Sequence, residues 1–598
     1  MKRFYLLLSL LCGMASASAQ VTDWQTVYEK SATLETPRYK QTIEYCRKLA
    51  KGSKMITYTN FGKSPQGRDL PLLILDRDGL SDPAAIHATG RTVLLVEACI
   101  HAGECEGKDA GLMLIRDLAI HAAGVTNQPA ALLDHVTVLF IPIFNVDGHE
   151  RFGPYNRINQ NGPKEMGWRT TANNLNLNRD FLKADAPEMQ AWLQLFNKWM
   201  PDFFIDSHTT DGADYQYVLT YLMEIYGDMD PGLTTWTRDI FIDQMQKHLK
   251  SGGYPIFPYV DYRNWHDPRS GLITEVAPPM LSQGYTALRN RPGLLIETHM
   301  LKPYKQRVEA TYECMLTTIE LLSRESMTLN ALVRKADDYV SSEAFLKQSF
   351  PLHFETSKTD STMTDFLGVE YTAIKSKVSG GDWFVYGKKP ATYKIPYFFS
   401  ARPKVSVTLP YAYIIPGEWK TVIDRLKIHG IRVTEIADEV TIKVNVCHFK
   451  NPKWQAIPYE SHHPMTNIEF DETEETRTFP AGSVLVSVMQ PAGRIIPHIL
   501  EPKGNGSYVY WGFFDACFEQ KEYGESYVIE KMAAEMMAND PALKTEFDQK
   551  KSADTAFANN PQLILNWFYN KSPFVDAKKG AYPVGKIFDR AVFEKLRR

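Results

Sequence analysis

The sequence predicts an α/β protein whose N-terminal part contains a mixed, mostly parallel central sheet covered by helices. From residue 92 to about residue 325, apolar runs such as TVLLVEACI and VTVLFIPIFN alternate with helical stretches such as GKDAGLMLIRDLAIHAA. Runs that are apolar throughout are typical of strands covered on both faces, and their alternation with helices favours parallel pairing. Beyond residue 350 the texture changes to short strands broken by Pro and Gly, which predicts a C-terminal α+β region.

Length and charge limit the possible classes of protein. At 598 residues the chain is long enough for two or more domains of about 150 residues each. We expect one domain over residues 20–335 and a C-terminal accessory region of unknown role over residues 336–598. The formal net charge of -3 argues against a nucleic acid or an anionic membrane as partner, because such binders are usually basic.

Residues 1–19 have the pattern of a signal peptide. Lys2 and Arg3 precede the apolar run FYLLLSLLCGM, and Ala17-Ser18-Ala19 fits a small-residue cleavage site. We therefore expect cleavage after Ala19 and a secreted or periplasmic protein. No other stretch reaches the roughly 18 apolar residues of a membrane helix, so no stable membrane insertion is expected.

The elements on either side of the alternating region can also be assigned. A helix is expected around residues 37–51, and the runs KMITYTNFG and RDLPLLILDRDG flank a Pro-Gln-Gly turn and predict a hairpin. Residues 305–348 look helical, and residues 410–436 predict a strand–helix–strand unit. Residues 451–478 are expected to be a surface loop, PAGSVLVSVMQ a strand, and residues 518–552 helical.

Polar side chains stand at the ends of four of the predicted strands. These residues are His101 with Glu104, Asn145, His208 and Glu297. In open α/β sheets ligands bind outside the carboxyl ends of the strands, so we expect these side chains to form one site.

The residue types in this set indicate a catalytic zinc ion. Two imidazoles and one carboxylate, from His101, Glu104 and His208, form a three-ligand site that leaves one position open. The His-x-x-Glu spacing alone is weak, because roughly one match is expected by chance. Glu297 lies in an apolar run and suits a general base. Arg169 and Arg179 suit the stabilisation of an oxyanion and the binding of a carboxylate.

Taken together, these motifs resemble those of the zinc carboxypeptidase (metallocarboxypeptidase) family. The resemblance covers about residues 35–325 and includes the His101–Glu104 motif, NVDGHERF, the Asn178-Arg179 pair, His208 and Glu297. It implies a zinc carboxypeptidase-like fold and a single zinc ion held by His101, Glu104 and His208.

The resemblance also implies roles for the remaining residues. Glu297 would deprotonate the zinc-bound water, and Arg169 would polarise the scissile carbonyl group. Asn178 and Arg179 would bind the terminal carboxylate of a peptide substrate. The implied activity is that of a secreted metallopeptidase that hydrolyses C-terminal peptide bonds.

Two positions depart from the family pattern. Asn176 stands where the family usually has an Asp that orients the first zinc histidine; an amide oxygen can accept the same hydrogen bond but donates less charge to the metal. The mobile tyrosine of the family has no clear match, and Tyr285 is the candidate for this substrate-binding role.

Several alternatives remain open at this stage. A cell-wall peptide amidase or endopeptidase, acting on muropeptide bonds with D-amino acids or diaminopimelate, is a second enzyme hypothesis, and Arg289 and Arg291 near Glu297 would favour an acidic substrate. A non-catalytic binding protein on the same fold is a third. The six cysteines of the mature chain follow no metal-binding or disulfide-scaffold spacing, but a disulfide between Cys99 and Cys105 is possible. The adjacent histidines in SHHP are expected to be solvated.

Overall fold

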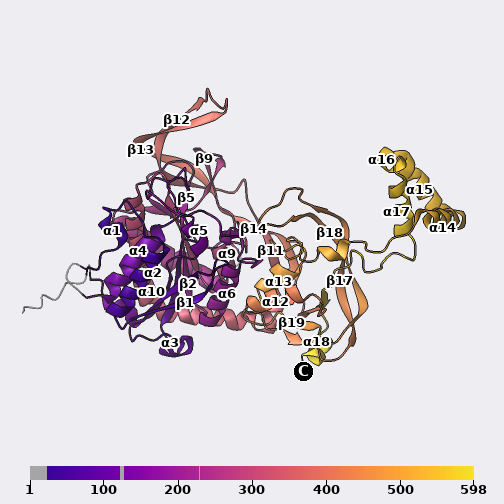
Figure 1. Ribbon diagram of the computed structural model, residues 1–598, viewed down its shortest axis with the longest axis horizontal. Helices are drawn as coiled ribbons and strands as arrows, with labels where there is room; N and C mark the ends of the chain where they lie inside the picture. Colours follow the sequence, from indigo (N-terminus) through magenta and orange to yellow (C-terminus); the bar gives the residue numbers. More distant parts are fainter. Residues whose placement is uncertain (1–22, 122–124, 126, 228, 598) are drawn as a thin grey trace, which may run out of the picture.

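The computed structural model describes residues 23–121, 125, 127–227 and 229–597 (Figure 1). The predicted signal peptide, residues 1–19, lies outside the described residues. Within them, no helix combines the length and the apolar character needed to cross a membrane.

An eight-stranded mixed sheet forms the centre of the N-terminal part, as the sequence predicted. Its strand order is β1-β2-β4-β3-β5-β10-β6-β7. The bounds are β1 Ile56–Lys63, β2 Asp69–Leu75, β3 Thr92–Ala98, β4 Val136–Ile141, β5 Phe203–Thr210, β6 Leu219–Leu222, β7 Ile256–Pro258 and β10 Gly293–His299. The central strands β4, β3, β5 and β10 are all parallel to one another, so their carboxyl ends meet at one edge.

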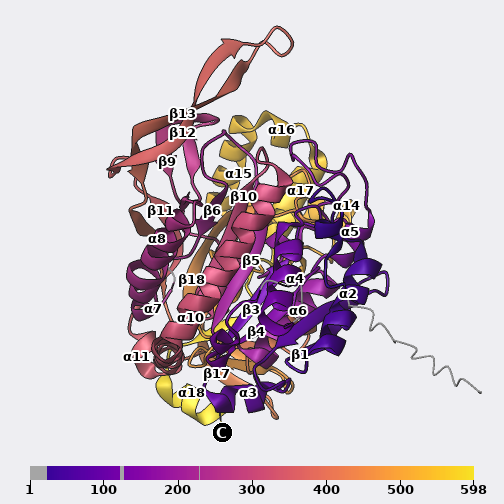
Figure 2. The ribbon, with the colours of Figure 1, turned by 90° about the vertical axis from the view of Figure 1, so that its left-hand side faces the viewer.

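Helices cover both faces of this sheet, because alternate apolar residues of each strand supply two separate cores. One core joins the sheet to α2, α4, α8 and α10, and the other joins it to α6 and α9. In Figure 2 the long helix α10 lies across the sheet in front of β5 and β10. The helices of this part are α1 Val27–Lys30, α2 Tyr39–Gly52, α3 Pro83–Thr89, α4 Glu106–Ala119, α5 Val146–Glu150, α6 Pro187–Trp199, α7 Pro231–Trp236, α8 Asp243–Ser251, α9 Ser282–Leu288 and α10 Tyr304–Val340.

The C-terminal part contains a six-stranded sheet of order β16-β19-β15-β20-β17-β18 in which every strand pair is antiparallel. Its strands are β15 Ala412–Ile415, β16 Thr434–Glu435, β17 Val440–Trp454, β18 Met465–Phe479, β19 Val484–Ser487 and β20 Gly585–Ile587. Its helices are α11 Glu343–Leu346, α12 Lys420–Ile428, α13 Ile495–Leu500, α14 Ser526–Asn539, α15 Pro541–Ala553, α16 Thr555–Ala558, α17 Pro561–Asn570 and α18 Arg590–Leu596. The strand–helix–strand unit β15-α12-β16 and the helical segment α14–α15 match the sequence-based expectations.

The surface loop expected over residues 451–478 was wrong. Most of this segment belongs to the antiparallel strands β17 and β18. Polar residues on both faces hid the alternation of a half-buried strand, and cross-strand charge pairs such as Lys443–Glu474 and Lys450–Asp471 stabilise the exposed ribbon instead.

Three features cross the expected boundary at residue 335. Helix α10 runs through it to Val340. Strand β13 (Asp382–Phe398) pairs with β9 (Asp267–Ile273) in a second sheet of order β12-β13-β9-β8, where β8 is Asp261–Asn264 and β12 is Thr362–Lys375. The remaining strands β11 (Ser349–Thr356) and β14 (Ala401–Thr408) pair with each other. One apolar core also continues from the α6–α9 face into the C-terminal sheet.

Candidate metal centre

The loop between β3 and α4 carries His101 and Glu104 and lies tightly against the neighbouring strand. A Cβ atom on Gly107 would lie only 2.3 Å from the Ser207 hydroxyl, so this close approach of α4 to β5 requires glycine. Asn145, the residue that precedes α5 in the loop after β4, donates hydrogen bonds from its amide to the carbonyls of Ile100 and Arg169, 3.4 and 3.2 Å away. Asn145 thereby fixes two segments of the site relative to each other.

His101, Glu104 and His208 converge at the carboxyl ends of β3 and β5. The Nδ1 atoms of the two histidines are 3.2 Å apart, and each lies 3.1 Å from an oxygen of Glu104. All three side chains are buried. The structure therefore brings together the three residues that the sequence suggested as ligands.

The far nitrogen of each imidazole is held by a hydrogen-bonding partner. Nε2 of His101 donates to the Asn176 amide oxygen at 3.0 Å, and Nε2 of His208 to the Asp206 carboxylate at 2.7 Å. The Ser282 hydroxyl donates to the same Asp206 oxygen at 2.6 Å. These contacts direct both Nδ1 atoms toward Glu104, as in metal sites where an outer group fixes the tautomer of the ligand.

The electrostatic environment suits a cation. Burial lowers the pKa of His101 to about 4, which keeps the imidazole neutral. Burial alone would raise the pKa of Glu104, but His101 and Arg157 hold it well below its usual value, so the carboxylate is ionised. Neutral imidazole and ionised carboxylate are the forms that bind metal. His208 differs: burial alone would lower its pKa, but the Asp206 carboxylate holds it well above the ordinary value, so a bound metal would have to displace a proton from this ring.

This donor set fits zinc. The three donor atoms lie within 4.8 Å of one another. Two ligands of a tetrahedral zinc, each about 2.0–2.1 Å from the ion, are separated by about 3.3 Å, close to the spacing of the two Nδ1 atoms. One carboxylate with two imidazoles leaves a coordination position open for catalysis.

Two guanidinium groups contact the Glu104 carboxylate. Arg157 donates to Oε1 at 2.6 Å, and Arg169 lies 3.5 Å from the same oxygen. Sequence reasoning missed Arg157, which lies in an Asn- and Gly-rich loop without a motif. It also passed over Asp206, although an Asp two residues before a strand histidine lies on the same face of the strand.

Asn178 and Arg179 lie beside this cluster. The Asn178 amide nitrogen is 3.4 Å from Nε2 of His208, and its buried Oδ1 has no hydrogen-bond partner among the described residues. Arg179 donates to the Asn178 carbonyl oxygen, and its half-buried guanidinium forms no ion pair with any described residue. It is therefore a cation that remains available for an anionic ligand.

Glu297 sits directly opposite His208 where β10 pairs with β5. Its Oε2 atom is buried and has no hydrogen-bond partner among the described residues. Burial raises the pKa of Glu297 to about 8, an effect that the nearby His208 opposes. A poorly solvated carboxyl group of this kind is typical of a catalytic acid or base.

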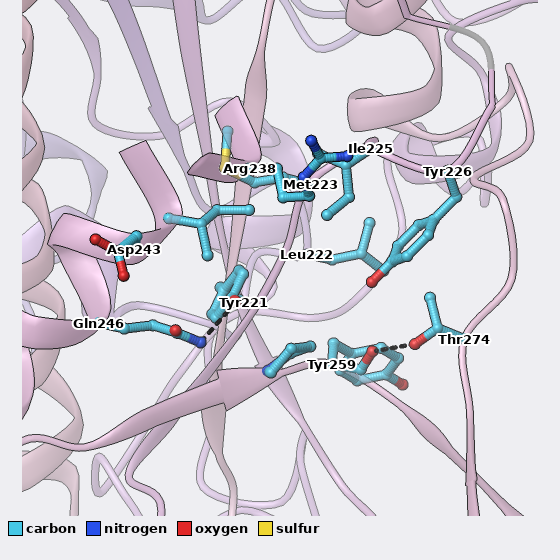
Figure 3. Close-up of a pocket in the computed structure, with 12 residues that line it drawn as sticks. Tyr221, Leu222, Met223, Ile225, Tyr226, Arg238, Asp243, Gln246, Tyr259 and Thr274 are labelled. Carbon is cyan, nitrogen blue, oxygen red and sulfur yellow. Dashed lines mark hydrogen bonds between the residues drawn. The ribbon is translucent and has the colours of Figure 1, made fainter. Parts of the chain in front are cut away.

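Tyr285 does not reach the cluster. It is fully buried in the core with its hydroxyl on His429, so its position does not support the substrate-binding role expected for it. Tyr259 lies near Glu297. Burial raises the pKa of the Tyr259 phenol, and the neighbouring Glu297 carboxylate adds to the effect. Tyr259 also borders a cavity of about 300 Å³, together with Tyr221, Tyr226 and Arg238 (Figure 3).

A second group of metal-ligating side chains is formed by Cys99, Cys105 and His149. Both ring nitrogens of His149 are engaged, Nε2 with the Lys108 ammonium at 2.8 Å and Nδ1 with Glu150 at 3.2 Å. This group is thus a hydrogen-bonded cluster, in which the two cysteines are free thiols.

Two arginines that were candidates for binding an acidic substrate, and one histidine that was expected to be solvated, instead contact other parts of the protein. Arg289 is buried against Asn197 and the His429 carbonyl, and Arg291 forms an ion pair with Asp337 at 2.9 Å. His462 contacts Asp185 at 2.7 Å, so it is not freely solvated.

Comparison with known proteins finds similarity to carboxypeptidases. Residues 42–221 match the family model for zinc carboxypeptidase. Carboxypeptidase 2 of Trichophyton rubrum is 23% identical over 488 residues, which cover 80% of this chain and 84% of the fungal protein. Carboxypeptidase 2 of Trichophyton equinum is 23% identical over 491 residues, with the same coverage. A metallo-carboxypeptidase from Burkholderia cenocepacia is 18% identical, with a TM-score of 0.36 over 48% of this chain and 69% of that chain.

Residues 42–221 therefore match a zinc carboxypeptidase domain, which supports the assignment of the chain as a zinc metallocarboxypeptidase hydrolase. His101, Glu104 and His208 lie within the matched segment, whereas Glu297 lies beyond it.

Proposed function

We propose that this protein is a secreted exopeptidase that removes C-terminal residues from peptides. The observation that carries the proposal is that two features occur together: the buried set of three possible metal ligands, and the guanidinium of Arg179, which forms no ion pair with a described residue. Arg179 follows Asn178, whose amide lies beside His208. An arginine that is already ion-paired within the protein could not bind the carboxylate of a substrate. An arginine without such a pair, next to the reacting groups, favours substrates that end in a carboxylate.

Each side chain has a separate part in the reaction. His101, Glu104 and His208 would hold one zinc ion, which supplies Lewis acidity toward a carbonyl oxygen and toward water. A zinc ion bound nearby would favour ionised Glu297, which in that form takes the proton of the attacking water and delivers it to the leaving amine nitrogen. Arg169 stabilises the negative charge that develops on the carbonyl oxygen, since its guanidinium is near Glu104, Arg179 and Glu297, whose charges act on it.

We assign the tyrosine of the site to Tyr259 rather than Tyr285. The phenol of Tyr259 is close enough to Glu297 and Thr210 for both to influence its pKa. As a hydrogen-bond donor there, it would contact the substrate backbone or the leaving amine.

One argument for the amidase alternative no longer applies. Arg289 and Arg291 were the residues that favoured a doubly charged substrate, and both are occupied by structural contacts.

The proposal is tested by incubating the zinc-loaded protein with a set of peptides that each exist as a free acid and as a C-terminal amide. Mass spectrometry should show loss of single C-terminal residues from the free acids only. Cleavage of internal bonds, or equal cleavage of acids and amides, would contradict exopeptidase action. A muropeptide pool assayed in parallel decides whether bonds with D-amino acids are preferred.

A further inference from the structure

Strands β12 and β13 form a two-stranded ribbon that extends away from the rest of the molecule. Figures 1 and 2 both show the ribbon projecting from the body of the protein, with β9 beside its inner part. The outer end, here called the ribbon tip, comprises residues 370–392. Most of its residues are exposed, so packing against the body of the protein does not account for its composition.

One face of the ribbon tip is covered. Tyr371, Phe384 and Tyr386 lie on this face, next to the β8–β9 hairpin. The Arg269 guanidinium lies 4.1 Å from the centroid of the Tyr371 ring, and the Tyr386 hydroxyl donates to the His266 carbonyl oxygen at 2.9 Å.

The opposite face of the ribbon tip is apolar and uncovered. Ile374 and Trp383 are direct cross-strand partners, and Val385 is next on the same face. Their exposed fractions are 46%, 57% and 37%, and Val378 in the connecting turn is 99% exposed. A contiguous exposed apolar patch on a soluble protein usually marks a binding surface.

The ribbon tip is also rich in basic residues. The ribbon tip has four lysines and two acidic residues. Lys375 pairs with Asp382 and Lys389 with Glu370. Lys377 and Lys388 form no ion pair with a described residue, so the ribbon tip is locally positive although the whole chain has a net charge of -3.

We propose that the ribbon tip binds anionic phospholipid surfaces, with Trp383, Ile374 and Val378 entering the headgroup region and the lysines contacting phosphates. Tryptophan is enriched at membrane interfaces, and juxtaposed lysines add attraction to anionic lipid. Lysine is depleted in protein–protein interfaces, which disfavours a protein partner. Lysines at exposed strand edges also oppose pairing with a second copy of the chain.

The base of the ribbon links this surface to the metal centre. Gly368 forms a β-bridge with Tyr215, and the Gln216 amide donates to the Gly368 carbonyl oxygen at 2.8 Å. Residues 215 and 216 follow β5, the strand that carries His208. A bound ribbon tip therefore fixes the catalytic half at the lipid surface.

Vesicle sedimentation tests the proposal with the full mature protein. Vesicles of phosphatidylcholine mixed with phosphatidylglycerol should pellet the protein at low salt, whereas vesicles of phosphatidylcholine alone should pellet far less. The double variants Ile374→Ser/Trp383→Ser and Lys377→Gln/Lys388→Gln should each lower the affinity for the anionic vesicles by at least roughly tenfold. Both should cleave a soluble peptide at the wild-type rate.

The matched control is Tyr527→Ser/Val528→Ser on α14. These two residues are also exposed, at 75% and 52%, and lie away from the ribbon in Figure 1. The control should bind vesicles like the wild type. Wild-type protein that ignores anionic vesicles, or ribbon variants that bind them unchanged, would overturn the proposal. So would a dimer in light scattering that the Ile374→Ser/Trp383→Ser change converts to a monomer without any vesicle binding.

Discussion

The Tyr285 hydroxyl donates a hydrogen bond of 3.0 Å to Nδ1 of His429, which joins the two halves of the chain through a buried contact. Nε2 of His429 lies 2.9 Å from the carbonyl oxygen of Leu182, an acceptor only, so the ring proton is on Nε2 and Nδ1 must accept. This contact is the reason that we propose a structural role for Tyr285 and the substrate-binding role for Tyr259.

Replacing each tyrosine with phenylalanine should separate these roles. Tyr285→Phe leaves Nδ1 of His429 buried without a donor and should destabilise the protein by about 1–3 kcal/mol, with kcat unchanged. Tyr259→Phe should keep the unfolding temperature and lower kcat/KM at least roughly tenfold, as expected for loss of a hydrogen bond to the reacting groups. Thermal unfolding and peptide kinetics on both variants make the comparison; a fall in kcat for Tyr285→Phe alone would reverse the assignment.

His429 also predicts an acid sensitivity. Burial lowers the pKa of His429 to about 3, below its ordinary value of 6.5. Between these values the unfolded chain binds a proton that the folded protein does not, so stability decreases as the pH falls below about 6.5. The loss from this residue should reach about 2 kcal/mol near pH 5.

The variant His429→Gln removes this titration while keeping an amide that can donate and accept. Its stability should therefore depend less steeply on pH than that of the wild type, measured by denaturant unfolding near pH 7 and near pH 5. Parallel curves for the two proteins would show that His429 is not responsible.

The central sheet and the three candidate metal ligands could be predicted from the sequence because both depend on local patterns. Apolar runs and the polar residues at their ends are readable without knowing the fold. Arg157 and the His429–Tyr285 contact depend on loops and on the packing of distant segments. The ribbon of β12 and β13 was missed because exposed strands do not need the apolar alternation that identifies half-buried ones.

The contact between Asn176 and His101 predicts a graded effect on zinc affinity. Asn176→Ala removes the acceptor of the Nε2–H group, and loss of such an outer partner typically weakens metal binding about 10–100-fold. Asn176→Asp restores an acceptor with more negative charge and should bind zinc at least as tightly as the wild type. Competition with a chromogenic chelator measures both affinities, and equal values for all three proteins would mean that the contact does not influence the metal.

Glu297→Gln tests the general base. The glutamine has nearly the same volume, so the variant should fold and retain one equivalent of zinc. Turnover should fall at least roughly a thousandfold, because an amide cannot accept the proton of the attacking water. Metal analysis accompanies the kinetics, with His208→Ala as the variant that should lose zinc. Near-wild-type turnover with zinc bound would identify a different base.

Arg179→Ala tests carboxylate recognition by the guanidinium that has no ion pair with a described residue. The loss of a charge-assisted contact should reduce kcat/KM for free-acid peptides by about 2–4 kcal/mol in transition-state free energy. The matching amides have no terminal carboxylate, so whatever slow cleavage they undergo should be nearly unchanged. Arg291→Ala is a poor control because Arg291 forms an ion pair with Asp337. Arg590, exposed on α18 and paired with Glu343, is a better one. If Arg179→Ala affects acids and amides equally, Arg179 does not bind the terminal carboxylate, and endopeptidase or amidase action becomes the better account of the site.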